Sequence, residues 1–175
     1  MTHKHHHDEV AITEHKTWKQ WIPLGVVFSY IIGLTILASI TGPSSTYTVS
    51  SYLMGYFFVI FSLFKLLDLQ AFALGYQEYD IIAQKNKYWG YIYPFIELLL
   101  GILYLLTVDT AALHIATIIL ATVTCISVLI KLAKHETFQC VCLGTVFKIP
   151  LTIVSLIEYA FMGLMAVLML LNVLR

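Results

Sequence analysis

Charged residues are scarce in this chain of 175 residues: they make up 11% of it, against about 25% in soluble domains. Hydrophobic residues make up 59%, and the mean hydropathy is +0.84. The formal net charge is zero and no large basic cluster is present, so nothing in the charge pattern indicates nucleic-acid binding. This composition is typical of an integral membrane protein.

Cysteines and catalytic motifs are also few. The three cysteines are an odd number and make no disulfide framework. The sequence has no glycine-rich phosphate loop, no G-x-S-x-G and no H-E-x-x-H, so the commonest catalytic signatures are missing. The first 20 residues carry both signs of charge and lack a short apolar core, so we expect no cleavable signal peptide.

Apolar runs, by contrast, fill most of the chain. They cover residues 21–41, 51–72, 89–106, 111–130 and 150–174. Each is about as long as the ~20 residues that cross a bilayer as a helix. No period-two alternation runs through them, which excludes barrel strands and leaves helices. The sequence predicts an all-α polytopic transmembrane bundle of about five helices in residues 21–175, after a polar, His-rich tail at 1–20. Residues 75–88 are predicted as a polar connection, and the tight turn at 108–110 predicts antiparallel neighbours on either side.

Lysines indicate the orientation of this bundle. They stand in the tail and in the second and fourth connections: Lys4, Lys16, Lys19, Lys85, Lys87, Lys131, Lys134 and Lys148. The first and third connections have none, and Arg175 alone lies at the other side. Positive residues favour the cytoplasmic side, so we expect a cytoplasmic N-terminus and a periplasmic C-terminus.

Four charged residues interrupt the apolar runs: Lys65, Asp68, Glu97 and Glu158. Charges inside membrane spans usually mark a function or a structural pair. The helical rise predicts that all four lie in the same half of the bundle, together with Cys125. Lys65 and Asp68 are three residues apart and would share a helix face. Pairing of Lys65 with Glu97, Asp68 or Glu158 would neutralise charge, and a purely structural role for such a pair stays open.

Two of the three cysteines, Cys140 and Cys142, are one residue apart in the connection before the last apolar run. Two thiolates at this spacing can bind one soft ion such as Cu(I), Zn(II) or Hg(II). They can also form a strained, labile disulfide, and a nearby Lys65 would favour the reactive thiolate. The plain alternative is a pair of small loop residues, and Cys125 is more typical of a packed core residue.

The tail is biased toward histidine, with His3, His5, His6 and His7 close together. Such tracts bind transition metals or remain solvated, and both interpretations stay open.

Several segments resemble the MauE and DoxX-like membrane protein families. They are Phe64-Lys65-Leu66-Leu67-Asp68, Phe72, Gly75-Tyr76-Gln77-Glu78-Tyr79-Asp80, and Tyr93-Pro94-Phe95-Ile96-Glu97 with Gly101. A further set of residues resembles the MauE branch in particular: Cys140-Val141-Cys142-Leu143-Gly144, Lys148-Ile149-Pro150 and Glu158. The resemblance covers roughly residues 50–165. It implies a four-helix core plus one helix in the bacterial inner membrane, with a redox association.

What is known of these families differs between branches. MauE is linked to the maturation of methylamine dehydrogenase, a disulfide-rich periplasmic enzyme. DoxX-like proteins are linked to quinone and sulfur metabolism, and some relatives are joined to heavy-metal-associated domains. The resemblance implies that the positions that matter here are Lys65, Asp68, Glu97, Cys140, Cys142 and Glu158. Periplasmic disulfide chemistry needs thiols on the oxidising side, whereas the lysine pattern places this pair on the other side. Either that orientation is wrong, or the thiols serve metal or cytosolic redox chemistry, and the histidine-rich tail on the same face favours metal.

The leading hypothesis is therefore a thiol site that acts in thiol redox or in soft-metal, copper-type handling. Cys140, Cys142, Lys65 and Glu97 would react, Asp68 and Glu158 would contact a cofactor, and the two thiols with the tail histidines would bind metal. An enzyme of this kind would be a thiol-disulfide or quinone-linked oxidoreductase, with Cu(I) or quinone as the cofactor. Expected partners are the lipid bilayer and a thiol or metal-carrier protein or a larger membrane complex, but no nucleic acid. The alternatives are a metal-ion transporter that uses His114 at the opposite face, and a non-catalytic accessory subunit.

Overall fold

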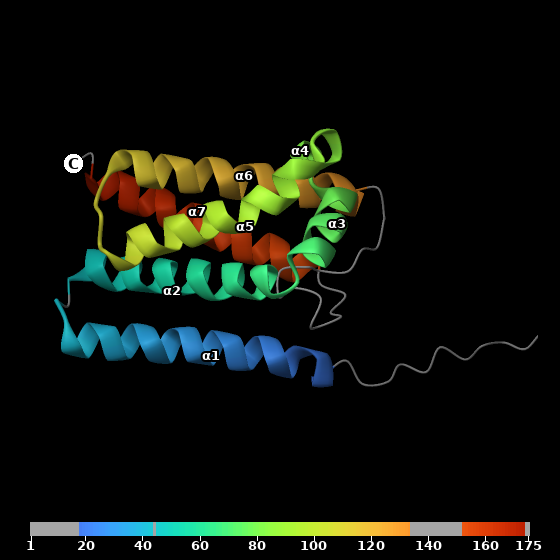
Figure 1. The fold of residues 1–175 in the computed structure, drawn as a ribbon. Coiled ribbons are helices and arrows are strands. Elements are labelled where there is room, and N and C mark those ends of the chain that lie inside the picture. The colour runs from blue at the N-terminus through green and yellow to red at the C-terminus, as the bar shows by residue number, and fades with distance from the viewer. Residues whose placement is uncertain (1–17, 44, 134–151, 174–175) are drawn as a thin grey trace, which may run out of the picture.

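Seven helices make up the part of the chain that the computed structural model describes, residues 18–43, 45–133 and 152–173, and no strand occurs in these ranges. The helices are α1 (Trp18–Thr41), α2 (Thr46–Leu67), α3 (Leu69–Tyr79), α4 (Ile81–Lys85), α5 (Lys87–Leu105), α6 (Ala111–Ala133) and α7 (Thr152–Val173). The five long helices run roughly along one direction (Figure 1).

The predicted polytopic bundle is confirmed. Four helices are long and apolar enough to cross a membrane, at Ile22–Thr41, Thr46–Leu67, Lys87–Leu105 and Ala111–Ala133. The fifth, α7, has 22 residues and a shorter apolar stretch, Glu158–Val173. The interior is filled mainly by aromatic, Met, Leu and Ala side chains.

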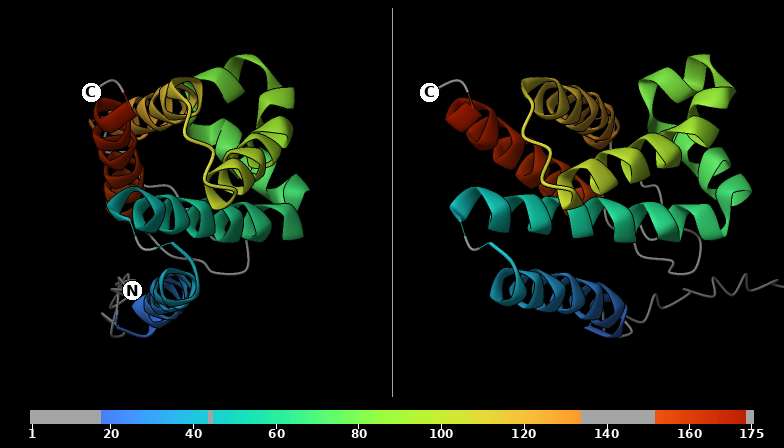
Figure 2. Two further views of the ribbon diagram at one scale, coloured as in Figure 1. Left: turned by 90° about the vertical axis from the view of Figure 1, so that its left-hand side faces the viewer. Right: turned by 60° about the vertical axis from the view of Figure 1, so that its left-hand side comes forward.

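The long helices pack in pairs. α2 packs mainly against α5, α6 packs mainly against α7, and α1 lies along the outer side of α2 (Figures 1 and 2). Glycines permit the close α2–α5 approach. A Cβ at Gly101 would lie 2.9 Å from the backbone nitrogen of Val59, and one at Gly55 would lie 2.9 Å from that of Leu105. Small residues at such positions let helix backbones meet within a membrane.

This pairing differs from the expectation for α5 and α6. The connection between them is short, as predicted, but the two helices diverge and each finds its main partner elsewhere. The turn fixes only where α5 ends and α6 begins. Gly55 and Gly101, by contrast, let α5 pack closely against α2.

The predicted single helix at 51–72 is wrong, because the chain breaks at Asp68. Asp68 ends α2 with φ −139° and ψ 71°, and its carboxylate accepts a hydrogen bond from the Ala71 backbone N–H at 3.1 Å. It is therefore the N-cap of α3, a role that aspartate commonly plays. Lys65 and Asp68 do not share a helix face, and Asp68 is exposed.

The predicted polar connection at 75–88 is largely helical. α3 crosses one end of the bundle and α4 follows it (Figure 1). Asp80, fully buried, caps α4 by accepting hydrogen bonds from the Ile82 and Ala83 N–H groups at 3.0 and 2.9 Å. The Ser127 hydroxyl of α6 donates to the other Asp80 oxygen at 3.2 Å. These bonds hold α3 and α4 against α6.

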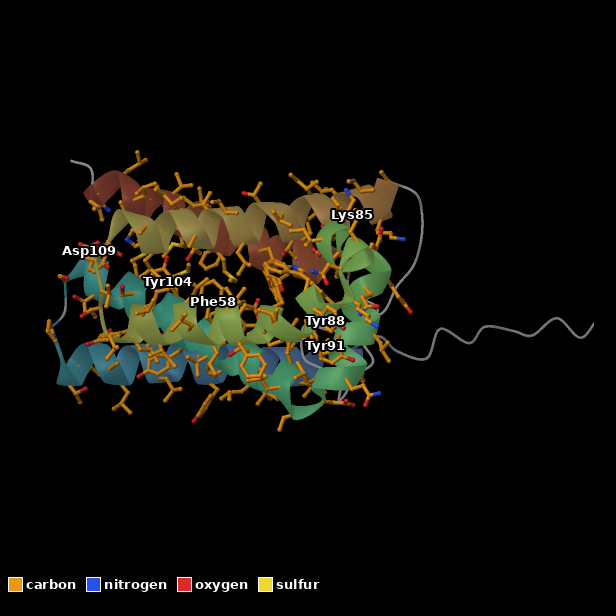
Figure 3. The ribbon with its side chains drawn as sticks, turned by 45° about the horizontal axis from the view of Figure 1, so that its top comes forward. Phe58, Lys85, Tyr88, Tyr91, Tyr104 and Asp109 are labelled. Carbon is orange, nitrogen blue, oxygen red and sulfur yellow. The ribbon has the colours of Figure 1, made fainter. Side chains whose placement is uncertain are left out.

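The two ends of the bundle differ. The α3 end, as we call it, comprises α3, α4, the end of α2, the start of α5, the end of α6 and the start of α7 (Figure 1). The opposite end holds the connections between α1 and α2 and between α5 and α6. Figure 3 shows Lys85 and Asp109 at these two ends. Three lysines outside the ion pair, Lys85, Lys87 and Lys131, belong to the α3 end.

Candidate functional site: a buried ion pair in an aromatic cage

An ion pair lies inside the bundle toward the α3 end. Lys65, on the last turn of α2, pairs through Nζ with Oε2 of Glu97 on α5. Their side chains are 1% and 2% exposed. Of the partners considered for Lys65, the structure selects Glu97. A lysine at this depth needs such a partner, because an unpaired charge in the membrane interior is costly.

Two tyrosines extend the pair across the bundle. The Tyr159 hydroxyl of α7 accepts a hydrogen bond from Lys65 at 3.3 Å and donates to Oε1 of Glu97 at 3.5 Å. The Tyr93 hydroxyl of α5 donates to Tyr159 at 3.2 Å and lies 3.4 Å from the Thr124 hydroxyl of α6. The cluster thus links the α2–α5 pair to the α6–α7 pair.

Aromatic rings surround the Lys65 ammonium. Nζ lies 5.0 Å from the ring centroid of Tyr93, 5.6 Å from that of Phe72 and 5.8 Å from that of Tyr159. Rings at these distances stabilise a cation through their quadrupoles. The cage compensates part of the hydration that Lys65 loses. We call Lys65, Glu97, Tyr159 and Tyr93 the Lys65 cluster.

Helix α3 covers the Lys65 cluster on the side that faces the α3 end of the bundle. Phe72 stacks on Tyr76 at 5.2 Å between ring centroids, and Tyr76 lies 4.6 Å from Tyr93. Burial raises the pKa of Tyr76 well above its usual range, and the negative charge of Asp80 raises it further. The Tyr76 phenol therefore stays protonated at neutral pH. α3 brings a neutral aromatic wall to the ion pair.

Glu158 and Tyr159 are adjacent but face different neighbours. Glu158 is 5% exposed and lines an apolar cavity of about 330 Å³ together with Phe28 and Ile31 of α1 and Phe57 of α2. Successive helical residues point in different directions, so Tyr159 reaches the ion pair while Glu158 faces α1. Glu158 is buried as expected, and the cavity that it lines lies beside α1.

The predicted thiol and histidine ligands lie outside the described residues: Cys140, Cys142, His3, His5, His6 and His7. What is described is their chain context. The segment 134–151 joins the end of α6 to the start of α7, and both helix ends are at the α3 end. Cys125 is described; it is a half-buried free thiol on α6.

His114 lies at the opposite end and is fully buried. Its Nε2 is 3.4 Å from Asp109, and its Nδ1 is 3.1 Å from the Tyr104 hydroxyl, which donates to Thr117 at 3.1 Å. Figure 3 shows Tyr104 inside the bundle beside Phe58, with which its ring stacks. Both His114 nitrogens thus have protein neighbours. Among the described residues, no group of three or more His, Cys, Asp or Glu side chains is placed to hold a metal ion.

Sequence reasoning missed the residues that complete the cluster. Tyr93 was noted only as part of the family resemblance, and Tyr159 was overlooked beside Glu158. Asp80 offered a usable signal, since an aspartate directly before Ile81-Ile82-Ala83 is a typical N-cap. The tyrosines offered no such signal, because only helix packing decides which of eleven tyrosines meet a buried charge.

Apolar spanning helices around a buried ion pair define a polytopic helical membrane protein. The sequence matches the family model described as "Methylamine utilisation protein MauE" over residues 43–172, and the chain belongs to the MauE family. The match includes the Lys65 cluster and both Cys140 and Cys142, and it begins after α1. No curated protein and no solved structure matches the chain.

Proposed function

We propose that this MauE-family membrane protein acts in thiol redox or soft-metal handling through Cys140 and Cys142, with the Lys65 cluster as the buried polar partner of the thiols. One observation carries the proposal. The buried ion pair lies toward the same end of the bundle as the two helix ends that the cysteine segment joins. Tyr159, which touches both charges of the pair, is on α7, the helix that follows the thiols.

The two chemistries share a requirement for proton movement. Disulfide formation from two thiols passes two electrons to an acceptor of the quinone class and releases two protons. Binding of Cu(I) by two thiolates releases the thiol protons as well. Glu97, Tyr159 and Tyr93 form a hydrogen-bonded chain that can take up or return a proton, and Lys65 favours the anionic form of groups near it. Glu158 and Asp68 remain proposed contacts of a cofactor.

The proposed setting is the bacterial inner membrane, with the α3 end in the cytoplasm. The grouping of Lys85, Lys87 and Lys131 at that end supports this orientation.

The experiment compares three purified proteins in detergent: wild type, Cys140→Ser/Cys142→Ser, and Cys125→Ser as a matched control that removes one thiol elsewhere. Each is titrated with Cu(I) and Zn(II), and its free thiols are counted after equilibration with glutathione buffers and with a soluble quinone. We expect the wild type and Cys125→Ser to bind one equivalent of soft metal or to lose two thiols reversibly. The double variant should do neither.

The two assays also separate the two chemistries. Metal binding without a change in thiol count supports soft-metal handling, and the reverse result supports thiol redox. If the double variant matches the wild type in both assays, the proposal is wrong.

A further inference from the structure

A cavity of about 280 Å³ lies between α5 and α6. It exists because these helices diverge, each packed on a different partner. Trp89, Tyr93 and Ile96 line it from α5, and Ala116, Ile119 and Thr124 line it from α6. Ile119 is 60% exposed on a helix suited to cross the membrane, so the cavity mouth faces lipid acyl chains.

The lining side chains are aliphatic or aromatic, and four of them carry a polar group: Tyr76, Trp89, Tyr93 and Thr124. The Trp89 Nε1–H is buried and has no hydrogen-bond acceptor in the described structure. An unsatisfied buried donor costs about 1–3 kcal/mol, and within a bilayer no bulk water is available to satisfy it. Tyr93 and Thr124, whose hydroxyls are 3.4 Å apart, line the same cavity. Ligand sites in proteins commonly combine an apolar wall with a few such polar groups.

We propose that this cavity binds the carbonyl end of a lipid-soluble molecule that enters sideways from the bilayer. The carbonyl oxygen accepts a hydrogen bond from Trp89, and the apolar wall covers the adjoining ring or chain. The volume is near the lower end of the range for ligand sites, about 300 Å³, so it takes one ring or one ester group while the rest of the molecule stays in the membrane. Ring carbonyls of quinones and ester carbonyls of glycerolipids share this chemistry.

The site adjoins the Lys65 cluster without including the thiols. Tyr93 forms part of the cavity wall, and its hydroxyl donates to Tyr159, which donates to Glu97. A ligand in the cavity therefore touches a residue of the cluster from the α5–α6 side. Cys140 and Cys142 contribute nothing to the inference, so it stands independently of the proposed thiol chemistry.

The test measures equilibrium binding of two probes, a short-chain alkyl benzoquinone and dioctanoylglycerol, to the full chain in nanodiscs. Trp89→Phe keeps an aromatic ring but removes the donor, and Ala116→Phe fills the cavity from its lipid side. Ala112→Phe places the same bulk on an exposed position of α6, one turn away and off the cavity wall, and serves as the matched control.

We expect one probe or both to bind saturably. Binding should weaken about tenfold in Trp89→Phe, the loss of one hydrogen bond, vanish in Ala116→Phe and stay unchanged in Ala112→Phe. It should also persist in Cys140→Ser/Cys142→Ser. Saturation by the benzoquinone alone assigns the site to quinones, and saturation by the glyceride alone assigns it to membrane lipids. Non-saturable partitioning of both probes, equal in all variants, would overturn the inference.

Discussion

Replacing Lys65 by methionine removes the positive charge of the buried pair and leaves Glu97, 2% exposed, without its cation. Removal of one partner of a buried pair costs about 3–5 kcal/mol of stability. The Tyr159 hydroxyl still donates to Glu97 at 3.5 Å, and the carboxyl group can take up a proton. We therefore expect the loss in the free energy of unfolding to lie at the lower end of that range, about 3 kcal/mol.

The double variant Lys65→Met/Glu97→Leu separates the ion pair from the packing of its side chains. It removes both charges and keeps apolar bulk in the cage, and such replacements are often neutral or stabilising. Among the described residues, Glu97→Leu alone leaves the Lys65 ammonium with the Tyr159 hydroxyl and three ring faces. Both single variants should thus be less stable than the double variant, a strongly non-additive result.

The assay is reversible unfolding by a denaturing detergent in mixed micelles, followed by circular dichroism. Lys87→Met is the matched control. It removes an exposed lysine that also lies over an aromatic ring, that of Tyr88 at 5.6 Å, and exposed charges contribute little to stability. The reasoning is refuted if Lys65→Met loses no more stability than Lys87→Met, or if the double variant loses the sum of the two single losses.

Two further predictions concern helix packing and orientation. Gly101→Ala should lower stability by about 1–3 kcal/mol through overpacking, because its Cβ would lie 2.9 Å from a backbone nitrogen of α2. Gly163→Ala, whose Cβ would be 3.4 Å from that of Ala121, should unfold like the wild type in the same assay; equal losses in both would contradict the close α2–α5 approach. For orientation, single cysteines at Lys85→Cys and Asp109→Cys are introduced after the native cysteines are changed to serine. A membrane-impermeant maleimide should label position 85 only in inside-out vesicles and position 109 only in right-side-out vesicles, and the reverse pattern would invert the proposed topology.

The helix-forming runs could be predicted because membrane spans are coded by length and hydropathy, both of which are local properties. The break at Asp68 could not be seen in this way. Leu69, Ala71 and Phe72 resume the apolar character of α2 beyond Asp68, so the apolar run extends past the break despite Gln70. The capping signal of Asp68 was present, but we interpreted the aspartate as a buried charge. A carboxylate in an apolar run can pair with a lysine or can cap a helix, and its exposure decides between the two.

The candidate site was predicted in part for a related reason. Depth along each helix follows from the rise per residue, so the presence of Lys65 and Glu97 in one half of the bundle could be inferred. Which carboxylate meets Lys65 depends on how each helix is rotated and paired. Glu158 satisfies the depth criterion, yet it faces α1, and the neighbouring Tyr159 faces the ion pair. A difference of one residue on a helix separates the two roles, and only tertiary packing fixes it.

The pairing of helices also bears on how the site could work. Lys65 and Glu97 belong to the tightly packed α2–α5 pair, whereas Tyr159 belongs to the α6–α7 pair. The segment with Cys140 and Cys142 joins α6 to α7, so a displacement caused there by the proposed thiol chemistry would act on these two helices. Because Tyr159 bonds to both charges, a small shift of α7 changes the hydrogen bonding of Lys65 and Glu97 together. The hydroxyl of Tyr159 is therefore the contact through which the thiols and the buried ion pair would influence each other.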